Sequence, residues 1–134
     1  MRLVNYGAGE MSDRLTILSL KILHGEMTGK EVKHFTNERE ALLAQIRSRT
    51  LNGSWLDQLL ALGAVNAALW YAEDALRTAR QQHVELVADP KELVQLVEAV
   101  RIAFCIQDLN DRRAALIETV NKQTGEHLGS EKLL

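Results

Sequence analysis

The sequence is poor in residues that interrupt helices or cross-link chains. It has one proline, Pro90, one cysteine, Cys105, and two residues each of Trp, Tyr and Phe. A single cysteine excludes an internal disulfide, and strands favour aromatic and β-branched side chains. Leucine and alanine, with 22 and 15 copies, lose little on entering a helix. The composition therefore predicts an all-α protein, and the length predicts a single domain over residues 1–134.

Neither sign of charge dominates the chain. Sixteen Lys and Arg stand against eighteen Asp and Glu, for a formal net charge of −2, and the basic residues lie mostly beside acids. Proteins that bind duplex DNA usually carry a basic face, so no duplex nucleic-acid partner is expected. No apolar run is long enough to cross a bilayer, and the first residues lack the apolar core of a signal peptide. We therefore expect a cytoplasmic protein with no membrane partner.

Start and stop signals divide the chain into four expected helices. Ser12 is typical of an N-cap, and Thr28 with Glu31 is typical of a capping box. Ser54 follows an Asn-Gly turn, and Pro90 is suited to the first turn of a helix. The expected helices cover residues 12–25, 29–49, 54–87 and 90–124, followed by a polar tail over residues 125–134.

The last two expected helices are long and their connection is short. A short connection makes neighbouring helices antiparallel, so the sequence predicts a four-helix, bundle-like domain with two long C-terminal antiparallel helices. Two such long helices exceed what two short helices can cover. We therefore expect a homodimer.

Polar residues interrupt the apolar pattern of both long helices. The third helix has an apolar stripe at Leu62, Val65, Leu69, Ala72, Leu76 and Ala79, and polar residues flank this stripe. The fourth helix has a seam of small and apolar residues at Ala99, Ala103, Ile106, Asn110, Ala114, Ile117 and Asn121. If the hairpin is regular, the two sets of polar residues lie at nearby heights. The candidate ligand-binding residues are Asn66, Trp70, Glu73, Arg77, Asn110 and Asp111.

We call these candidate residues of the two long helices the polar level, and they have two interpretations. Asn66 and Asn110 can be core asparagines that bond to each other and fix the helix register. Alternatively, the level is a ligand pocket, in which amides recognise polar groups, Arg77 holds a phosphate or carboxylate and Trp70 stacks on a planar ring.

Other motifs match the known patterns of nucleotide-binding loops and metal sites only in part. Gly7-Ala8-Gly9 lacks the third glycine of a dinucleotide-binding loop. The four histidines have no partner at zinc-ligand spacing. Asp108 and Asp111 resemble half of a magnesium site, without a Glu-x-x-Glu pair on another helix. No catalytic residue, metal ligand or cofactor is therefore predicted.

Three segments together resemble a known family. They are residues 9–18 (GEMSDRLTIL) with Lys21, residues 66–70 (NAALW) with Glu73, Asp74 and Arg77, and residues 110–114 (NDRRA) with Asn121 and Glu131-Lys132. In this order and spacing they are similar to an uncharacterised bacterial family of short all-helical proteins, a domain of unknown function. The chain departs from the family pattern at its end, where Leu133-Leu134 replace an expected aromatic residue. The resemblance implies a helical fold and a bacterial or phage source, and it implies no activity.

Three functions remain open at this point. The first is a non-enzymatic helical protein that binds a small polar or phosphorylated, nucleotide-like ligand or a partner protein. The second is a metal-dependent nucleotide-processing enzyme with Glu73, Asp74 and Asp111 as ligands. The third is a pure oligomerisation module.

Overall fold

The computed structural model describes residues 7–49, 51, 53–83 and 90–125. Within these residues the chain is helical, with no strand, which confirms the predicted all-α fold. None of the described helices is both long and apolar enough to cross a membrane. The four helices are α1 (Ala8–Met27), α2 (Lys33–Arg47), α3 (Gly53–His83) and α4 (Pro90–Thr124).

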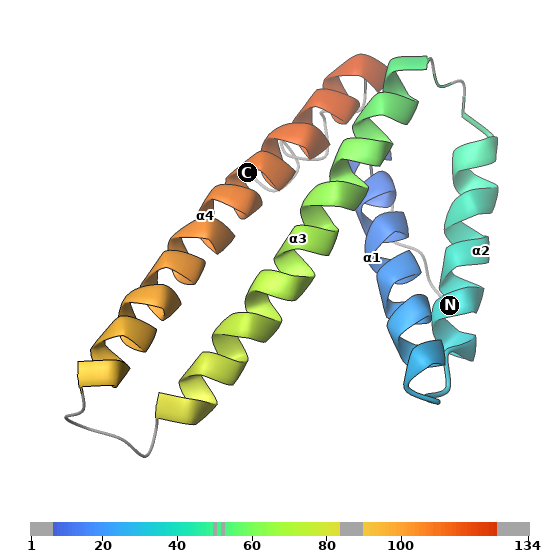
Figure 1. Cartoon of the computed structure of the whole chain (residues 1–134). Helices are drawn as coiled ribbons and strands as arrows, with labels where there is room; N and C mark the ends of the chain where they lie inside the picture. Colours follow the sequence, from blue (N-terminus) through green and yellow to red (C-terminus); the bar gives the residue numbers. More distant parts are fainter. Residues whose placement is uncertain (1–6, 50, 52, 84–89, 126–134) are drawn as a thin grey trace, which may run out of the picture.

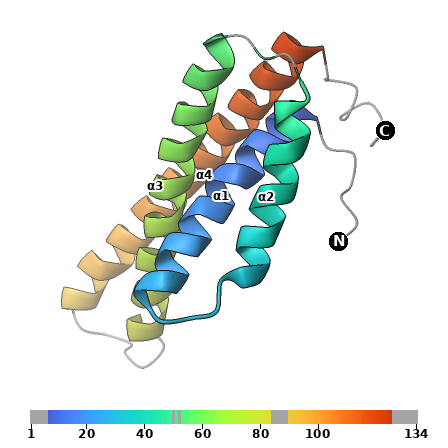
Figure 2. The same cartoon turned by 90° about the vertical axis from the view of Figure 1, so that its right-hand side faces the viewer.

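Helix α1 is the central element of the bundle. It packs against α2, α3 and α4, whereas α2 comes close to α1 and, among the described helices, to neither α3 nor α4 (Figures 1 and 2). The long helices α3 and α4 form the predicted antiparallel hairpin. Near the connection between them, this hairpin leans away from α1 and α2 (Figure 1).

The predicted start of the first helix is wrong. Helix α1 begins at Ala8, with Gly7 as its N-cap, and Ser12 lies buried inside the helix. The Ser12 hydroxyl donates to the backbone oxygen of Ala8 at 2.6 Å and accepts from Trp55 Nε1 at 2.8 Å. Serine favours N-caps because it bonds to backbone, and here it makes the alternative bond to the preceding turn.

Thr28 ends a helix and does not begin one, so the predicted capping box is also wrong. Gly29 has φ of 72°, and its amide donates to the oxygen of Glu26, while the amide of Lys30 donates to Gly25. These two bonds form a Schellman motif, in which glycine adopts the left-handed conformation without steric cost. Helix α2 therefore begins at Lys33, where the backbone amide donates to the Glu31 carboxylate at 3.0 Å.

The boundaries of the long helices follow the sequence signals more closely. Helix α3 begins at Gly53, one residue before the expected start, and α4 spans the predicted residues from Pro90 to Thr124. Gly125 follows with φ of 74°, which is typical of a helix stop. The expected end of the third helix at residue 87 and the tail beyond residue 125 lie outside the described residues.

The core forms where α1 meets α2 and the start of α3. Apolar side chains of α1 and α2 are buried against each other and are covered at the edge by partly buried neighbours such as Trp55. On α3, every member of the predicted apolar stripe is buried or half-buried. The buried cluster consists of Met11, Leu15, Leu18, Leu42 and Ile46.

The predicted seam of α4 is rotated from the inward face. Ala103, Asn110 and Ala114 are exposed, whereas Leu109 and Arg113 are half-buried. At 100° per residue, Arg113 lies about 60° around the helix from Asn110. A hydropathy pattern assigns apolar residues, and not arginine, to the inward face of a helix. Arg113 nevertheless lies on the inward side of α4, because the buried Asp13 carboxylate on α1 accepts its hydrogen bonds.

The start of α1 lies against α4 because Gly9 has no side chain. A Cβ atom added at Gly9 would lie 2.3 Å from the backbone oxygen of Ile117. The same approach lets the Gly9 amide donate to Asn121 Oδ1 at 2.8 Å. Glycine therefore fixes the contact distance between these two helices.

We expect Gly9→Ala to lower the free energy of unfolding by about 1–3 kcal/mol, because overpacking forces the helices apart. Gly53→Ala is the control, since an added Cβ meets nothing within 4 Å there. This control should stay within about 0.5 kcal/mol of wild type. Urea denaturation followed by circular dichroism measures both, and equal stability of the two variants would contradict the assignment.

Candidate functional site

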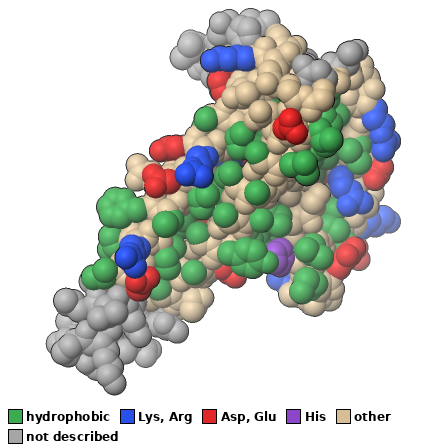
Figure 3. All heavy atoms as spheres, turned by 45° about the horizontal axis from the view of Figure 1, so that its top comes forward, with side chains coloured by type: hydrophobic (Ala, Val, Ile, Leu, Met, Phe, Trp, Pro, Cys, Tyr) green, Lys and Arg blue, Asp and Glu red, His purple; other side chains and the backbone are tan. Residues whose placement is uncertain are grey.

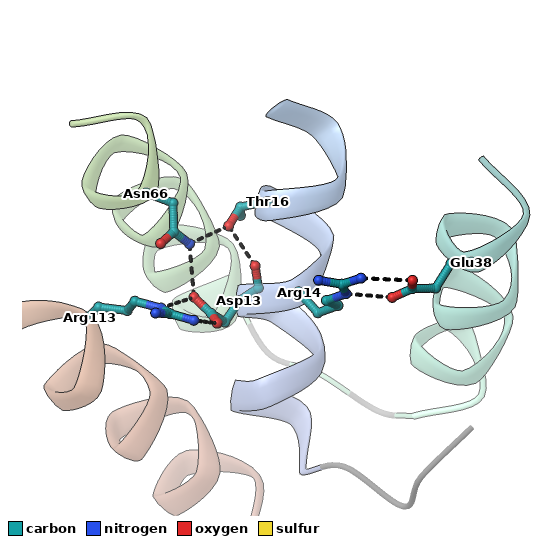
Figure 4. A network of polar contacts seen from close by, with 6 residues as sticks. All are labelled: Asp13, Arg14, Thr16, Glu38, Asn66 and Arg113. Carbon is teal, nitrogen blue, oxygen red and sulfur yellow. Dashed lines mark hydrogen bonds and ion pairs between the residues drawn. The ribbon is translucent and has the colours of Figure 1, made fainter. Parts of the chain in front are cut away.

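The carboxylate of Asp13 lies buried between α1, α3 and α4 and accepts hydrogen bonds from both long helices (Figure 4). Its Oδ1 accepts from Asn66 Nδ2 and from Arg113 Nε, each at 2.8 Å, and its Oδ2 accepts from Arg113 Nη2 at 2.6 Å. Asn66 also donates to the Thr16 hydroxyl at 2.7 Å. One carboxylate therefore joins three helices.

The Asp13–Arg113 ion pair is stable because the buried Asp13 carboxylate has both a counter-charge and hydrogen-bond donors. The Asp13 side chain is 8% exposed and that of Arg113 is 34% exposed. An unpaired buried carboxylate is costly, whereas two parallel N–H···O bonds from a guanidinium compensate for the lost hydration. The hydrogen bond to Asp13 raises the pKa of Arg113, and burial opposes this shift. Arg113 therefore stays charged over the whole working range of pH.

A second ion pair fastens α2 to the opposite side of α1. Arg14 donates to the Glu38 carboxylate through Nε at 2.5 Å and through Nη2 at 2.8 Å (Figure 4). This hydrogen bonding lowers the pKa of Glu38 below its usual value of 4.5, although burial acts in the other direction. The pair is partly open to solvent, so it contributes less than the Asp13 pair.

Asn121 provides a second polar contact between α1 and α4, through its side-chain amide. It is 1% exposed, and its Oδ1 accepts the amide of Gly9. Its Nδ2 donates to the two carboxylate oxygens of Glu10 at 3.0 and 2.9 Å. Asn121 thus bonds to the Gly9 amide and the Glu10 carboxylate in the first turn of α1. The amides of a first helical turn have no backbone partner within their own helix.

A small pocket lies beside the Asp13 network, between α1, α3 and α4. Its volume is about 210 Å³. Four of the six predicted site residues line it, namely Asn66, Trp70, Glu73 and Asn110. The other lining residues are Ile17, Leu20, Lys21, Leu69 and Arg113.

Several polar groups of this pocket make no hydrogen bond or ion pair with another described residue. They are the side chains of Lys21, Glu73 and Asn110, and the Lys21 ammonium also lies 5.3 Å from the centre of the Phe35 ring on α2, in a cation–π contact. Arg113 uses Nε and Nη2 on Asp13, which leaves the N–H groups of Nη1. One face of Trp70 is covered by His24, with ring centroids 4.5 Å apart and planes inclined by 5°. The pocket therefore offers donors, one acceptor group and an aromatic wall.

Two predicted site residues lie outside this pocket. Arg77 is one turn further along α3, exposed, and donates to Asp74 of its own helix at 3.0 Å. Asp111 is exposed on α4. Asn66 bonds to Asp13 and Thr16, so the interpretation in which Asn66 and Asn110 bond to each other is wrong. Within the described ranges, no three His, Cys, Asp or Glu side chains gather to hold a metal ion.

Sequence reasoning missed Asp13, Arg113 and Lys21 as members of the site. The predicted site residues all belong to the two long helices, whereas the central carboxylate belongs to α1. The charge content of α1 gives no signal, since five of its 20 residues are Asp, Glu, Lys or Arg, the same 25% as in the whole chain. A buried carboxylate needs a partner from another element, and the partner of Asp13 is fixed by tertiary contacts.

Comparison of the chain with protein-family models, curated proteins and solved structures finds no match in any of the three. The site must therefore be interpreted from its own geometry.

We expect Arg113→Met to lower the free energy of unfolding by about 3 kcal/mol, because it leaves the buried Asp13 carboxylate without a counter-charge. Arg77→Met is the matched control, since its pair with Asp74 has side chains 66% and 63% exposed. The control should cost less than about 0.5 kcal/mol. Chemical denaturation of both variants measures the difference, and equal losses would show that Asp13 does not depend on Arg113.

The Arg14–Glu38 pair predicts a pH dependence. Because the pKa of Glu38 is lowered in the folded state, its stabilisation is complete above the unfolded value of 4.5 and is lost as the pH falls through the folded pKa. Glu38→Gln should therefore be less stable than wild type at neutral pH, and the difference should shrink below pH 4.5. Melting temperatures of both proteins between neutral and acidic pH test this, and a constant difference would contradict it.

Proposed function

We propose that this chain is a non-enzymatic helical protein that binds a small polar ligand with an anionic group in the pocket between α1, α3 and α4. The observation that carries the proposal is that Lys21, Glu73 and Asn110 lie around one hollow without a hydrogen bond or ion pair to another described residue, beside the remaining N–H groups of Arg113. Polar groups that face a pocket without partners are available for recognition of a ligand.

The charges of the pocket favour a ligand with two kinds of polar group. The Lys21 ammonium and the Arg113 guanidinium suit a phosphate or carboxylate. Glu73 suits a hydroxyl or amino group, and the Asn110 amide can accept and donate. Because Asp13 neutralises Arg113, the positive charge in the lining that has no anionic partner belongs to Lys21, whose ammonium contacts the Phe35 ring. Lys21 is therefore the residue on which the anion preference depends.

The size of the pocket limits the ligand. At about 210 Å³, it is smaller than the pockets of roughly 300–1,000 Å³ that enclose drug-sized molecules. A phosphate with a short carbon skeleton fits this volume, whereas a whole nucleotide would place only its charged end inside. The metal-dependent enzyme is not favoured, because Glu73, Asp74 and Asp111 belong to no group of three possible metal ligands within the described ranges.

Calorimetric titration with inorganic phosphate, acetate and adenosine monophosphate tests the proposal, together with thermal shift. A ligand of the native state raises the melting temperature, by an amount worth about 2.7 kcal/mol at a hundredfold excess over Kd. Lys21→Met should raise Kd about tenfold or more, equivalent to about 1.4 kcal/mol for the lost charge.

Lys33→Met is the control, because Lys33 is exposed at the start of α2 and outside the pocket. It should bind like wild type. Failure of all three anions to bind, or equal binding by Lys21→Met and wild type, would overturn the proposal.

A further inference from the structure

The side-chain oxygen of Asn66 is a buried acceptor in the pocket between α1, α3 and α4, which we call the polar pocket. Asn66 is 5% exposed and lines this pocket. Both hydrogens of its Nδ2 are used, one on Asp13 Oδ1 at 2.8 Å and one on the Thr16 hydroxyl at 2.7 Å. Its Oδ1 accepts no hydrogen bond from another described residue. A buried oxygen without a donor destabilises the folded state, so native proteins contain few of them.

The orientation of the Asn66 amide is fixed by its two partners. The Thr16 hydroxyl donates its one hydrogen to the backbone oxygen of Asp13 at 2.8 Å, so it can only accept from Asn66. The Asp13 carboxylate, which is paired with Arg113, also only accepts. Turning the amide over would place its oxygen against two acceptors. The nitrogen therefore faces α1, and the oxygen lies on the side away from Thr16 (Figure 4).

A donor of the same network accompanies this oxygen in the lining of the polar pocket. Asn66 Nδ2 and Arg113 Nε bond to the same atom, Asp13 Oδ1, each at 2.8 Å. Arg113 also lines the pocket, and Nη1 is the guanidinium nitrogen that Asp13 does not use. The lining on α3 runs from buried Asn66 through half-buried Trp70 to exposed Glu73. The buried end of the pocket therefore presents an acceptor from Asn66 and a donor group from Arg113.

A larger hollow over α1, between α2 and α3, has a different chemical character. Its volume is about 660 Å³ and its walls are mostly leucine. On the face drawn in Figure 3, hydrophobic side chains gather in the middle and most charged side chains lie towards the edges. Apolar walls select a ligand by size and shape, whereas a buried oxygen selects for a hydrogen-bond donor. Selection of a ligand by its functional groups therefore depends on the polar pocket.

We propose that the ligand of the polar pocket is a small hydroxy acid or hydroxyalkyl phosphate, with its hydroxyl group at Asn66. This rests on the proposed function, from which it takes the anionic group, and it adds the group that the buried end selects. A hydroxyl donates one hydrogen and accepts at the same atom. It therefore donates to Asn66 Oδ1 and accepts from Arg113 Nη1.

A hydroxyl fits the buried end better than a charged group does. An ammonium has three donors and a charge, whereas Asn66 offers one neutral acceptor beside a guanidinium, and Asp13 is already paired. A carboxylate or phosphate oxygen could accept from Arg113, but it has no hydrogen for Asn66 and would face the amide oxygen. The anionic group of the ligand is therefore expected towards the open end.

The distance between the two ends limits the length of the ligand. Lys21 follows Thr16 by five residues, which is about 7.5 Å along the axis of α1. A molecule that reaches from the level of Asn66 to that of Lys21 has its hydroxyl and its anionic group roughly three carbon atoms apart. γ-Hydroxybutyrate has this spacing.

Calorimetric titration of the wild-type protein with butyrate, γ-hydroxybutyrate and γ-aminobutyrate tests the proposal, because these molecules differ in one terminal group. γ-Hydroxybutyrate should bind about tenfold more tightly than butyrate or better, since butyrate leaves Asn66 without a donor. γ-Aminobutyrate should bind no better than butyrate. Propyl phosphate and its terminal hydroxyl derivative form the same pair for a pocket that accepts phosphate and not carboxylate.

Asn66→Ala should abolish the preference for the hydroxyl compound, because it removes the acceptor. Asn121→Ala is the matched control, since Asn121 is also buried and bonds α4 to α1, but it lies outside the pocket. This control should keep the preference. Circular dichroism establishes that each variant is folded, and the wild-type comparison decides the outcome if Asn66→Ala is not.

The possible failures of the two proposals differ. Equal binding of the hydroxyl and plain compounds in both series would overturn the hydroxyl assignment and leave the proposed function standing. Tightest binding of γ-aminobutyrate, or a hydroxyl preference that Asn66→Ala retains, would also overturn the assignment. Failure of every anion to bind would overturn the proposed function together with it.

Discussion

The arrangement of α1, α3 and α4 depends on the need to satisfy one buried carboxylate. Asp13 is largely shielded from water, so the folded state needs a counter-charge and further hydrogen-bond donors around its carboxylate. Arg113 supplies two of these bonds from α4 and Asn66 supplies one from α3. A shift of either helix along its axis would break this geometry, so the network fixes the register of both helices against α1.

The central position of α1 divides the molecule into two chemically different sides. On one side, polar residues of three helices surround a pocket of about 210 Å³. On the other side, leucines of α1, α2 and α3 line a groove of about 660 Å³. Both hollows have α1 as a wall, and Leu20 lines both of them, so one helix borders two hollows of different chemistry.

The helical class and the hairpin were predictable from the sequence because they depend on local signals. The leucine and alanine content, Pro90 and Gly125 act over a few residues, and the structure follows them. The signals around Thr28 failed because a residue that caps a helix start is equally suited to the turn after a helix. Of the predicted positions, Asn66, Trp70, Glu73 and Asn110 line the pocket, whereas Arg77 and Asp111 do not. Asp13 and Arg113 depend on tertiary contacts that periodicity within one helix does not contain.

The sequence separations in the network have a consequence for folding during synthesis. Asp13 and Arg113 are 100 residues apart, and Gly9 and Asn121 are 112 residues apart, which is a long range for a helical bundle. While α4 is still inside the ribosome, α1 to α3 are outside with the Asp13 carboxylate lacking its guanidinium. Such a chain can form helices and bury the leucines of α1 against α2, but its third and fourth helices close only when α4 emerges. A pause in translation before α4 would therefore hold the molecule in a loosely packed state with an exposed apolar face.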